Sequence, residues 1–235
     1  MNIMDAEGNY PFFDGYYGAL DHFNRGSINI SPLSTYYTYA TDSYAQVKIH
    51  DGNDELRQHA LFLSATYPQR IAAAGCHAYT ITPVLLSTSI VFECAFKQLN
   101  TAQQGERLSI GLFSERVYSH DAFSSMPMIA LRYDGGDNSA SPKQGYEFVH
   151  RAGESGSGST TIISTGVSRN NLYNLFRIVW SIDAIEFYMN GEMRYRATSN
   201  IPLRPLHIAF SVMNARTATA LDIRVLIDYW HIYIK

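Results

Sequence analysis

Two acidic side chains have the residue type and the setting for acid–base chemistry. Glu93 and Glu147 lie in separate apolar runs that are typical of β-strands. Glycoside hydrolysis uses two carboxyl groups, ~5 Å apart when configuration is retained and ~6.5 to 9.5 Å apart when it is inverted. If the fold brings the two strands together, Glu93 and Glu147 could form such a pair.

Other enzyme signatures are weaker. Tyr146 and His150 share one run and could move a proton, but His150 is in phase with apolar neighbours, as is His207, so we interpret both histidines as core or rim residues. The 8 histidines never form a His-Glu-x-x-His motif, and the sequence has no Gly-x-Ser-x-Gly elbow and no phosphate-binding loop. We therefore expect no enzyme built on these motifs.

Two acidic loops have oxygen ligands of the kind that Ca²⁺ prefers. They begin at Asp51 and Asp134 and are also rich in Gly and Asn. Neither completes an EF-hand loop, because Leu56 stands where the first loop would need glycine. The same residues are what tight turns require, so we expect turns and no metal, with Ca²⁺ as the alternative.

Short apolar or alternating runs, bounded by Gly, Asn, Asp, Ser and Pro, predict an all-β chain from about Val47 onward. The clearest runs are 60–65, 89–98, 108–114, 128–133, 146–151, 160–164, 175–181, 184–188, 206–213 and 221–234. The stretch from Asn53 to Leu63 could instead begin as a helical turn. For the hairpin at Asn190-Gly191 we predict a three-residue loop, because it pairs Phe187 with Met193 and keeps the apolar side chains on one face.

The first 45 residues differ from the rest of the chain. They are rich in aromatic residues among Gly, Ser, Asn and Pro, and no strand or helix period orders them. We expect either that this segment wraps its own domain or that it is an arm that docks on a neighbouring subunit. The residues assigned to the docking arm are Phe12, Phe13, Tyr16, Tyr17, Tyr36 and Tyr37. The predicted domains are an arm over 1–45 and one β domain over 46–235.

Composition excludes several classes of protein. With 46% hydrophobic and 17% charged residues and a net charge of −3, the chain is neither disordered nor a binder of nucleic acid. It has no apolar run long enough to insert in a membrane and no signal peptide, so we expect a virion or cytoplasmic protein, or one that leaves the cell by another route. Arginine outnumbers lysine 14 to 4, which suits packed interfaces. Whether Cys76 and Cys94 form a disulfide stays open.

Three stretches resemble the concanavalin A-like lectin/glucanase superfamily. Ser89 to Gln98 is similar to its "G-x-F-E-x-R-x-K" strand, Phe176 to Gly191 to its "W-x-x-x-x-I-x-F-Y-V-D-G" hairpin, and 205–214 with 228–234 to its two closing strands. The resemblance covers about residues 47–235 and implies an all-β, two-sheet antiparallel jelly-roll β-sandwich, preceded by the irregular aromatic-rich arm. The glucanases of this superfamily have Glu-x-Asp-x-Glu on one strand, and the chain lacks that motif.

The resemblance also implies a carbohydrate-binding surface. Alternation along the strands turns Arg132, Glu147 and Arg151 to an outer sheet face, and Trp230 with Arg224 and Asp228 to one face of the last strand. The candidate glycan contacts are therefore Arg132, Glu147, Arg151 and Trp230; a solvated face with cross-strand ion pairs is the alternative.

Two functions follow from these observations. The first is a non-catalytic structural or binding module, such as a phage virion surface, decoration or adhesin protein, with other protein subunits and surface glycans as its partners. The second is a hydrolase or lyase of the same superfamily that uses a non-standard acid pair.

Overall fold

The computed structural model describes residues 19–21, 37–41, 45–54, 57–66, 74–80, 84, 86, 89–99, 105–114, 126–135, 144–154, 159–214 and 222–234. For the residues before Val84 it describes the backbone, and of their side chains only that of Leu63. These residues form β-strands and connecting turns. In this part of the chain, no helix has the length and hydropathy needed to cross a bilayer.

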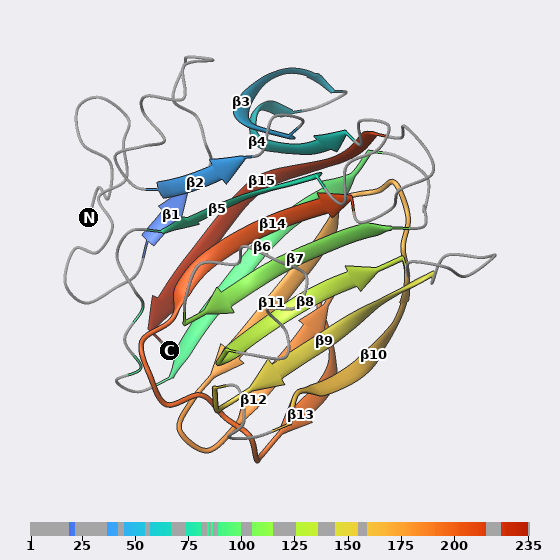
Figure 1. The fold of residues 1–235 in the computed structure, drawn as a ribbon. Coiled ribbons are helices and arrows are strands. Elements are labelled where there is room, and N and C mark those ends of the chain that lie inside the picture. The colour runs from blue at the N-terminus through green and yellow to red at the C-terminus, as the bar shows by residue number, and fades with distance from the viewer. Residues whose placement is uncertain are drawn as a thin grey trace.

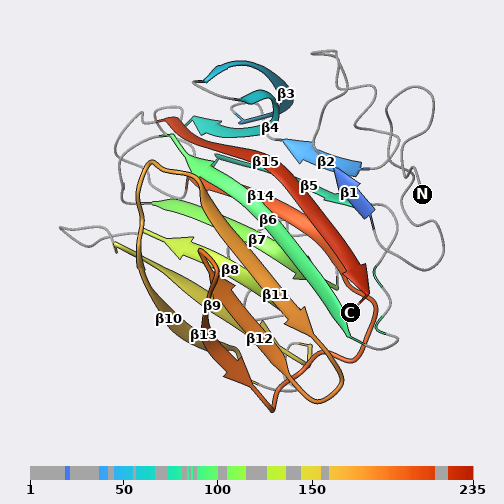
Figure 2. The ribbon, with the colours of Figure 1, turned by 180° about the vertical axis from the view of Figure 1, so that it is seen from behind.

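The strands form two antiparallel sheets that pack face to face (Figures 1 and 2). The eight-stranded sheet has the order β13 (Glu192–Ala197), β12 (Ile185–Met189), β11 (Asn174–Trp180), β6 (Ile90–Gln98), β15 (Asp222–Ile234), β4 (Arg57–Thr66) and β3 (Ala45–Asp54), with β1 (Ala19–Asp21) also on β15. The seven-stranded sheet has the order β10 (Thr161–Ser168), β9 (Gly145–Arg151), β8 (Met128–Asp134), β7 (Glu106–Phe113), β14 (His207–Asn214), β5 (Ala74–Thr80) and β2 (Tyr37–Thr41). The predicted all-β jelly-roll sandwich is confirmed.

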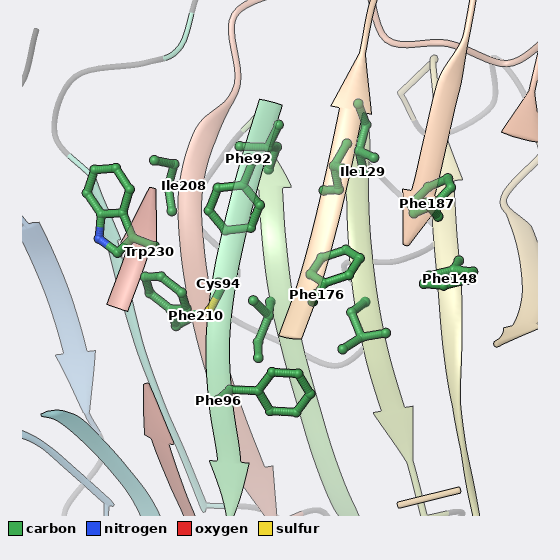
Figure 3. Close-up of a cluster of buried hydrophobic side chains, with 14 of the residues drawn as sticks. Phe92, Cys94, Phe96, Ile129, Phe148, Phe176, Phe187, Ile208, Phe210 and Trp230 are labelled. Atoms are coloured by element: carbon green, nitrogen blue, oxygen red, sulfur yellow. The ribbon is translucent and has the colours of Figure 1, made fainter. Parts of the chain in front are cut away.

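The core lies between the two sheets and follows the alternation of the strands. On β6, Phe92, Cys94 and Phe96 point inward, and Figure 3 shows them beside Phe176 of the same sheet and Phe210 of the opposite one. Phe148 of β9 stacks on Phe187 of β12 with ring centroids 4.8 Å apart, which joins the sheets directly. Since every second residue of these strands is apolar, both sheets bury one face against each other.

A buried polar cluster also connects the sheets. Glu106 of β7 accepts a hydrogen bond from Arg169 and one from Gln98 of β6, both at 2.8 Å. Tyr146 of β9 donates to the other side of the Gln98 amide at 2.6 Å, and the Arg169 guanidinium lies over the Tyr133 ring at 5.3 Å. Because a buried charge is tolerated when it is paired, this cluster completes an otherwise apolar core.

The predicted helical turn at Asn53 is wrong. Asn53 and Asp54 end β3, and the following residues from Arg57 to Thr66 form β4, which pairs with both β3 and β15. Ala60 and Leu63 fit a helix only when the local pattern is considered alone, and Leu56 lies outside the described residues. Pairing with two neighbouring strands gives the same apolar residues a sheet to join, so tertiary context overrides the local preference.

The predicted register of the Asn190-Gly191 hairpin is also wrong. Both residues have positive φ, 53° and 86°, as a two-residue type I′ turn requires. The ladder pairs Tyr188 with Met193 and then, across a bulge, Phe187 with Tyr195. Arg194 is the extra residue of that bulge. Without a bulge, Tyr195 faces the core only if the loop has three residues, which is why the sequence predicted the longer loop.

Two short parts of the aromatic-rich N-terminal stretch belong to the sheets. β1 pairs with the second half of β15, and β2 pairs with β5. Of the six residues assigned to the docking arm, Tyr37 is the first residue of β2. Phe12, Phe13, Tyr16, Tyr17 and Tyr36 lie outside the described residues. The stretch therefore contributes one strand to each sheet, and its docking role stays a prediction.

Candidate functional site

Arg132 and Glu147 come together on the outer face of the seven-stranded sheet. They are direct cross-strand partners on β8 and β9, and the Arg132 Nε atom lies 2.7 Å from the Glu147 Oε2 atom. Their side chains are 12% and 17% exposed, so solvent reaches both. The alternation that turns Leu131 and Phe148 into the core is what turns this charged pair outward.

Serine residues extend this pair into a row across the sheet. Ser164 of β10 is the cross-strand partner of Glu147, Ser109 of β7 is the partner of Arg132, and Ser211 of β14 is the partner of Ser109. The outer face thus carries hydroxyl, carboxylate and guanidinium groups on five neighbouring strands, of which the Ser109 hydroxyl is buried, with 4% exposure. These are the groups that form directed hydrogen bonds to hydroxyl-rich ligands.

An apolar cluster borders this polar row on the same face. Its members are buried although their strands turn them away from the core: Phe113, Met126, Met128, Ala130, Val149 and Ala209. Met128, Ala130, Arg132 and Asp134 are the four outward positions of β8. Only Asp134 is a carboxylate, so β8 offers no acid pair of the glucanase kind.

Arg151, the third predicted contact, has a structural role. It is 4% exposed and ends β9. Its guanidinium donates to the carbonyl oxygens of Gly153 and Glu154, each at 2.7 Å, and to the Thr160 hydroxyl at 3.1 Å. These bonds join the two ends of the Gly/Ser-rich connection between β9 and β10. With its donors used there, Arg151 supports that connection and does not belong to the exposed row.

The prediction that Trp230 is a glycan contact is wrong. Trp230 is fully buried in the core, where Figure 3 shows it beside Ile208 and Phe210. The register of β15 on β6 shifts between Ile227 and Tyr229, which makes Asp228 an extra residue. Strict alternation along β15 would turn Trp230 outward. The extra residue reverses the alternation, so Trp230 points into the core on the same side as Val225 and Ile227.

The predicted acid pair does not form. Glu93 lies on β6 of the eight-stranded sheet and Glu147 on β9 of the seven-stranded sheet, and both are on outward positions. Two packed sheets lie ~10 Å apart, and these side chains leave from opposite sides, so their separation exceeds the ~9.5 Å limit for a catalytic pair.

Tyr146 and His150 are not a catalytic pair on the surface either. Both point into the core, where the Tyr146 hydroxyl donates to Gln98, and burial raises the pKa of Tyr146 well above its usual value. The pKa of His150 is lowered by burial, and its Nδ1 atom lies 3.1 Å from the Asn200 carbonyl oxygen. The prediction that His150 is a core histidine is confirmed.

The described residues contain no group of three or more His, Cys, Asp or Glu side chains that could hold a metal ion. Asp134 pairs with Arg107 across β7 and β8 at 3.4 Å, and Asp51 lies within β3. Most of the loop that begins at Asp134, from residue 136 on, lies outside the described residues, so Ca²⁺ as the alternative stays untested. Cys94 is a free thiol in the core, and burial raises its pKa, which makes it unreactive.

The sites predicted from the sequence do not include a set of residues on the outer face of the eight-stranded sheet. Arg177, Tyr188, His231 and Tyr233 are partly exposed on the outer side of the eight-stranded sheet, together with Glu93. Alternation along β11 and β12 identifies Arg177 and Tyr188 as outward residues. The bulge at Asp228 hid His231 and Tyr233, because it exchanges the two faces of the last strand.

Comparison with solved structures identifies the fold. A Bacillus licheniformis β-glucanase aligns over 95% of this chain and 100% of its own, with a TM-score of 0.61 and 15% sequence identity. The chain has a concanavalin A-like jelly-roll fold. The Emp46p carbohydrate recognition domain aligns over 94% of this chain and 97% of its own, with a TM-score of 0.62 and 10% identity.

A third similar structure comes from work on endo-acting O-glycanases of the human gut microbiota. It aligns over 91% of this chain and 97% of its own, with a TM-score of 0.63 and 12% identity. The sequence matches no protein-family model and no curated protein. Since one fold serves both lectins and glycosidases, activity must be argued from the site.

Proposed function

We propose that this protein is a non-catalytic carbohydrate-binding module, with the row around Arg132 and Glu147 as its contact surface. The observation that supports it most is the partly exposed Arg132–Glu147 pair, 2.7 Å apart, set in a row of serines. Pairing holds both charged groups in place, so a sugar meets an already ordered set of donors and acceptors. The similarity in fold to a carbohydrate recognition domain supports the proposal.

Hydrolysis is the second candidate, because similar structures include glucanases. The predicted pair of Glu93 and Glu147 cannot perform it, since the two residues lie on opposite sheets. Glu147 accepts a hydrogen bond from Arg132, and its cross-strand partners are Arg132 and Ser164, so no second acid lies directly opposite it. The binding function is therefore the one that the described residues support best.

The test is binding of the purified protein to a panel of immobilised glycans, with Arg132→Ala and Glu147→Gln as variants. Each substitution removes one group of the row, and we expect affinity to fall about tenfold, the equivalent of one charge-assisted hydrogen bond. Arg204→Ala is the matched control, because Arg204 pairs with Glu154 away from this face. Equal binding by all three variants would reject the row as the site, and release of new reducing ends would make the protein a hydrolase.

We further propose that the module is part of a larger assembly, such as a virion surface or decoration protein. The aromatic residues Phe12, Phe13, Tyr16 and Tyr17 precede β1, which joins the edge of β15 at Ala19. Aromatic side chains provide large contact areas at low entropic cost, which suits a docking segment. In this proposal the segment before β1 binds a neighbouring subunit, and the sandwich presents its outer faces to glycans.

A further inference from the structure

We propose that the outer face of the eight-stranded sheet is a second carbohydrate-contact surface, formed by a strip of planar side chains: Tyr188, Arg177, Tyr233 and His231. The inference extends the proposed function, because it gives the module a second site on the side opposite Arg132 and Glu147. The ligand class is a neutral polysaccharide, which the strip would contact through several successive sugars.

The strip crosses four adjacent strands. Tyr188 of β12 is paired with Arg177 of β11, Arg177 with Glu93 of β6, and Glu93 with His231 of β15. Figure 2 shows these four strands side by side on the near side of the molecule. Three strand spacings of ~4.8 Å give a length of about 14 Å, so the strip is longer than a single pyranose ring.

Contacts between the planar groups connect them into one layer. The Arg177 guanidinium carbon lies 5.3 Å from the centre of the Tyr188 ring, and an Arg177 nitrogen lies 3.4 Å from the Tyr233 hydroxyl. The Tyr233 and His231 rings are 4.7 Å apart. Tyr233 is the cross-strand partner of Val91 on β6, so the contact between Tyr233 and Arg177 of β11 spans β6. Val91 is on an outward position of β6 and is nevertheless fully buried.

The polar tips of the rings are already bonded within the protein. The Tyr188 hydroxyl donates to Glu186 at 2.9 Å, and the Tyr233 hydroxyl accepts from Arg177. Neighbouring groups therefore hold both rings in place before a ligand arrives. Aromatic faces carry negative potential and attract the weakly positive C–H groups on the face of a pyranose ring. Little side-chain entropy remains to be lost on binding.

Charged groups beside the strip supply hydrogen bonds without a large net charge. Glu93 accepts from the Tyr229 hydroxyl at 3.1 Å, and a carboxylate has four lone-pair sites, so it can also accept from sugar hydroxyls. Next to the strip, Arg177 and Arg196 are matched by Glu93 and Glu186, which itself pairs with Arg196 at 3.5 Å, while Lys97 and Arg224 lie farther along β6 and β15. This balance favours a neutral polysaccharide over an acidic one.

The experiment is affinity electrophoresis of the full chain in gels that contain mixed-linkage β-glucan, xylan or galactomannan. Tyr188→Ala and Tyr233→Ala each remove one ring, and we expect each to weaken retardation by the polysaccharide about fivefold to tenfold. Tyr188→Phe and Tyr233→Phe keep the ring, so we expect them to retain most of the binding. Leu172→Ala changes an exposed side chain away from the strip and serves as the control. Thermal unfolding of each variant checks that it folds.

The results separate this inference from the proposed function. If Arg132→Ala abolishes binding while both alanine variants at the strip bind like the wild type, the strip is rejected and the first site stands. If the wild type binds none of the polysaccharides or the glycan panel, both proposals fail. If the alanine variants change only the mass of the protein in solution, measured by light scattering, the strip is a protein interface and the inference is wrong.

Discussion

His150 shows how one side chain combines structural and electrostatic roles. It is 1% exposed and packs against the rings of Phe187 and Tyr195, with centroids 6.1 and 6.0 Å away. Its Nδ1 atom meets the carbonyl of Asn200, whose own side chain bonds back to the His150 carbonyl at 3.3 Å. The neutral ring is therefore the form that packs, with Nδ1 as the donor, and no described hydrogen-bond partner faces Nε2.

Stability should consequently fall in mild acid. Burial lowers the pKa of His150 in the folded protein below the ordinary value of 6.5, so the unfolded chain binds the proton more readily. The stabilising contribution is complete above pH 6.5 and is lost as the pH falls below that value. We expect urea unfolding at pH 7 and pH 5 to show a larger drop in the free energy of unfolding for the wild type than for His150→Phe. Equal drops would mean that His150 does not couple to folding.

At the scale of elements, two bulges decide which side chains reach a surface. Asp228 is the extra residue of β15, and it moves Trp230 into the core and Tyr229 and His231 outward. Arg194 is the extra residue of β13, and it moves Tyr195 and Ala197 onto the core face. A bulge reverses the face of every later residue in its strand, so an error at one position changes the whole predicted surface.

The hairpin allows a matched test of this effect. Deleting Arg194 removes the bulge but keeps the pairs Phe187–Tyr195 and Ile185–Ala197, so we expect the free energy of unfolding to change by about 1 kcal/mol or less. Deleting Arg196 keeps the bulge and turns Ala197 outward, so we expect a loss of roughly 2 kcal/mol or more. Both arginines are exposed and each pairs with one glutamate, so each deletion removes one positive charge and one surface ion pair. Chemical denaturation of the two variants compares them, and equal losses would contradict the bulge model.

At the scale of the whole molecule, the sandwich has two outer faces that lie back to back. One holds the Arg132–Glu147 row, and the other holds the strip of Tyr188, Arg177, Tyr233 and His231. The N-terminal stretch adds β2 at the edge of the seven-stranded sheet, beside β5, and β1 beside the second half of β15. A module with two contact faces can bridge two polysaccharide chains, and linked sites raise the apparent affinity beyond that of either one.

Truncation tests whether the segment before β1 mediates assembly. Removing residues 1–18 leaves β1 and β2 in place, so we expect an unchanged melting temperature and a lower mass by light scattering. Removing residues 1–45 also deletes a strand from each sheet and opens the edges of β15 and β5, so we expect a lower melting temperature. If the shorter deletion leaves the mass unchanged, the assembly role of residues 1–18 is wrong.

The sequence by itself determined the fold class and most of the core. Apolar alternation in runs such as Phe92 to Phe96 and Tyr146 to Phe148 gives the strand and its buried face, because successive side chains must point to opposite sides. The same rule placed Arg132 and Glu147 on the surface, and the structure shows that they pair. These properties depend on local covalent geometry, which a single strand already contains.

Only the tertiary structure decided which surface residues meet. The separation of Glu93 from Glu147 depends on which sheet each strand joins, and no local pattern encodes that choice. The burial of Trp230 and the exposure of His231 depend on a bulge at Asp228, which forms where β15 must match β6. Strands that are far apart in the sequence pair with each other, and this pairing fixes both the order of the strands and the register of their side chains.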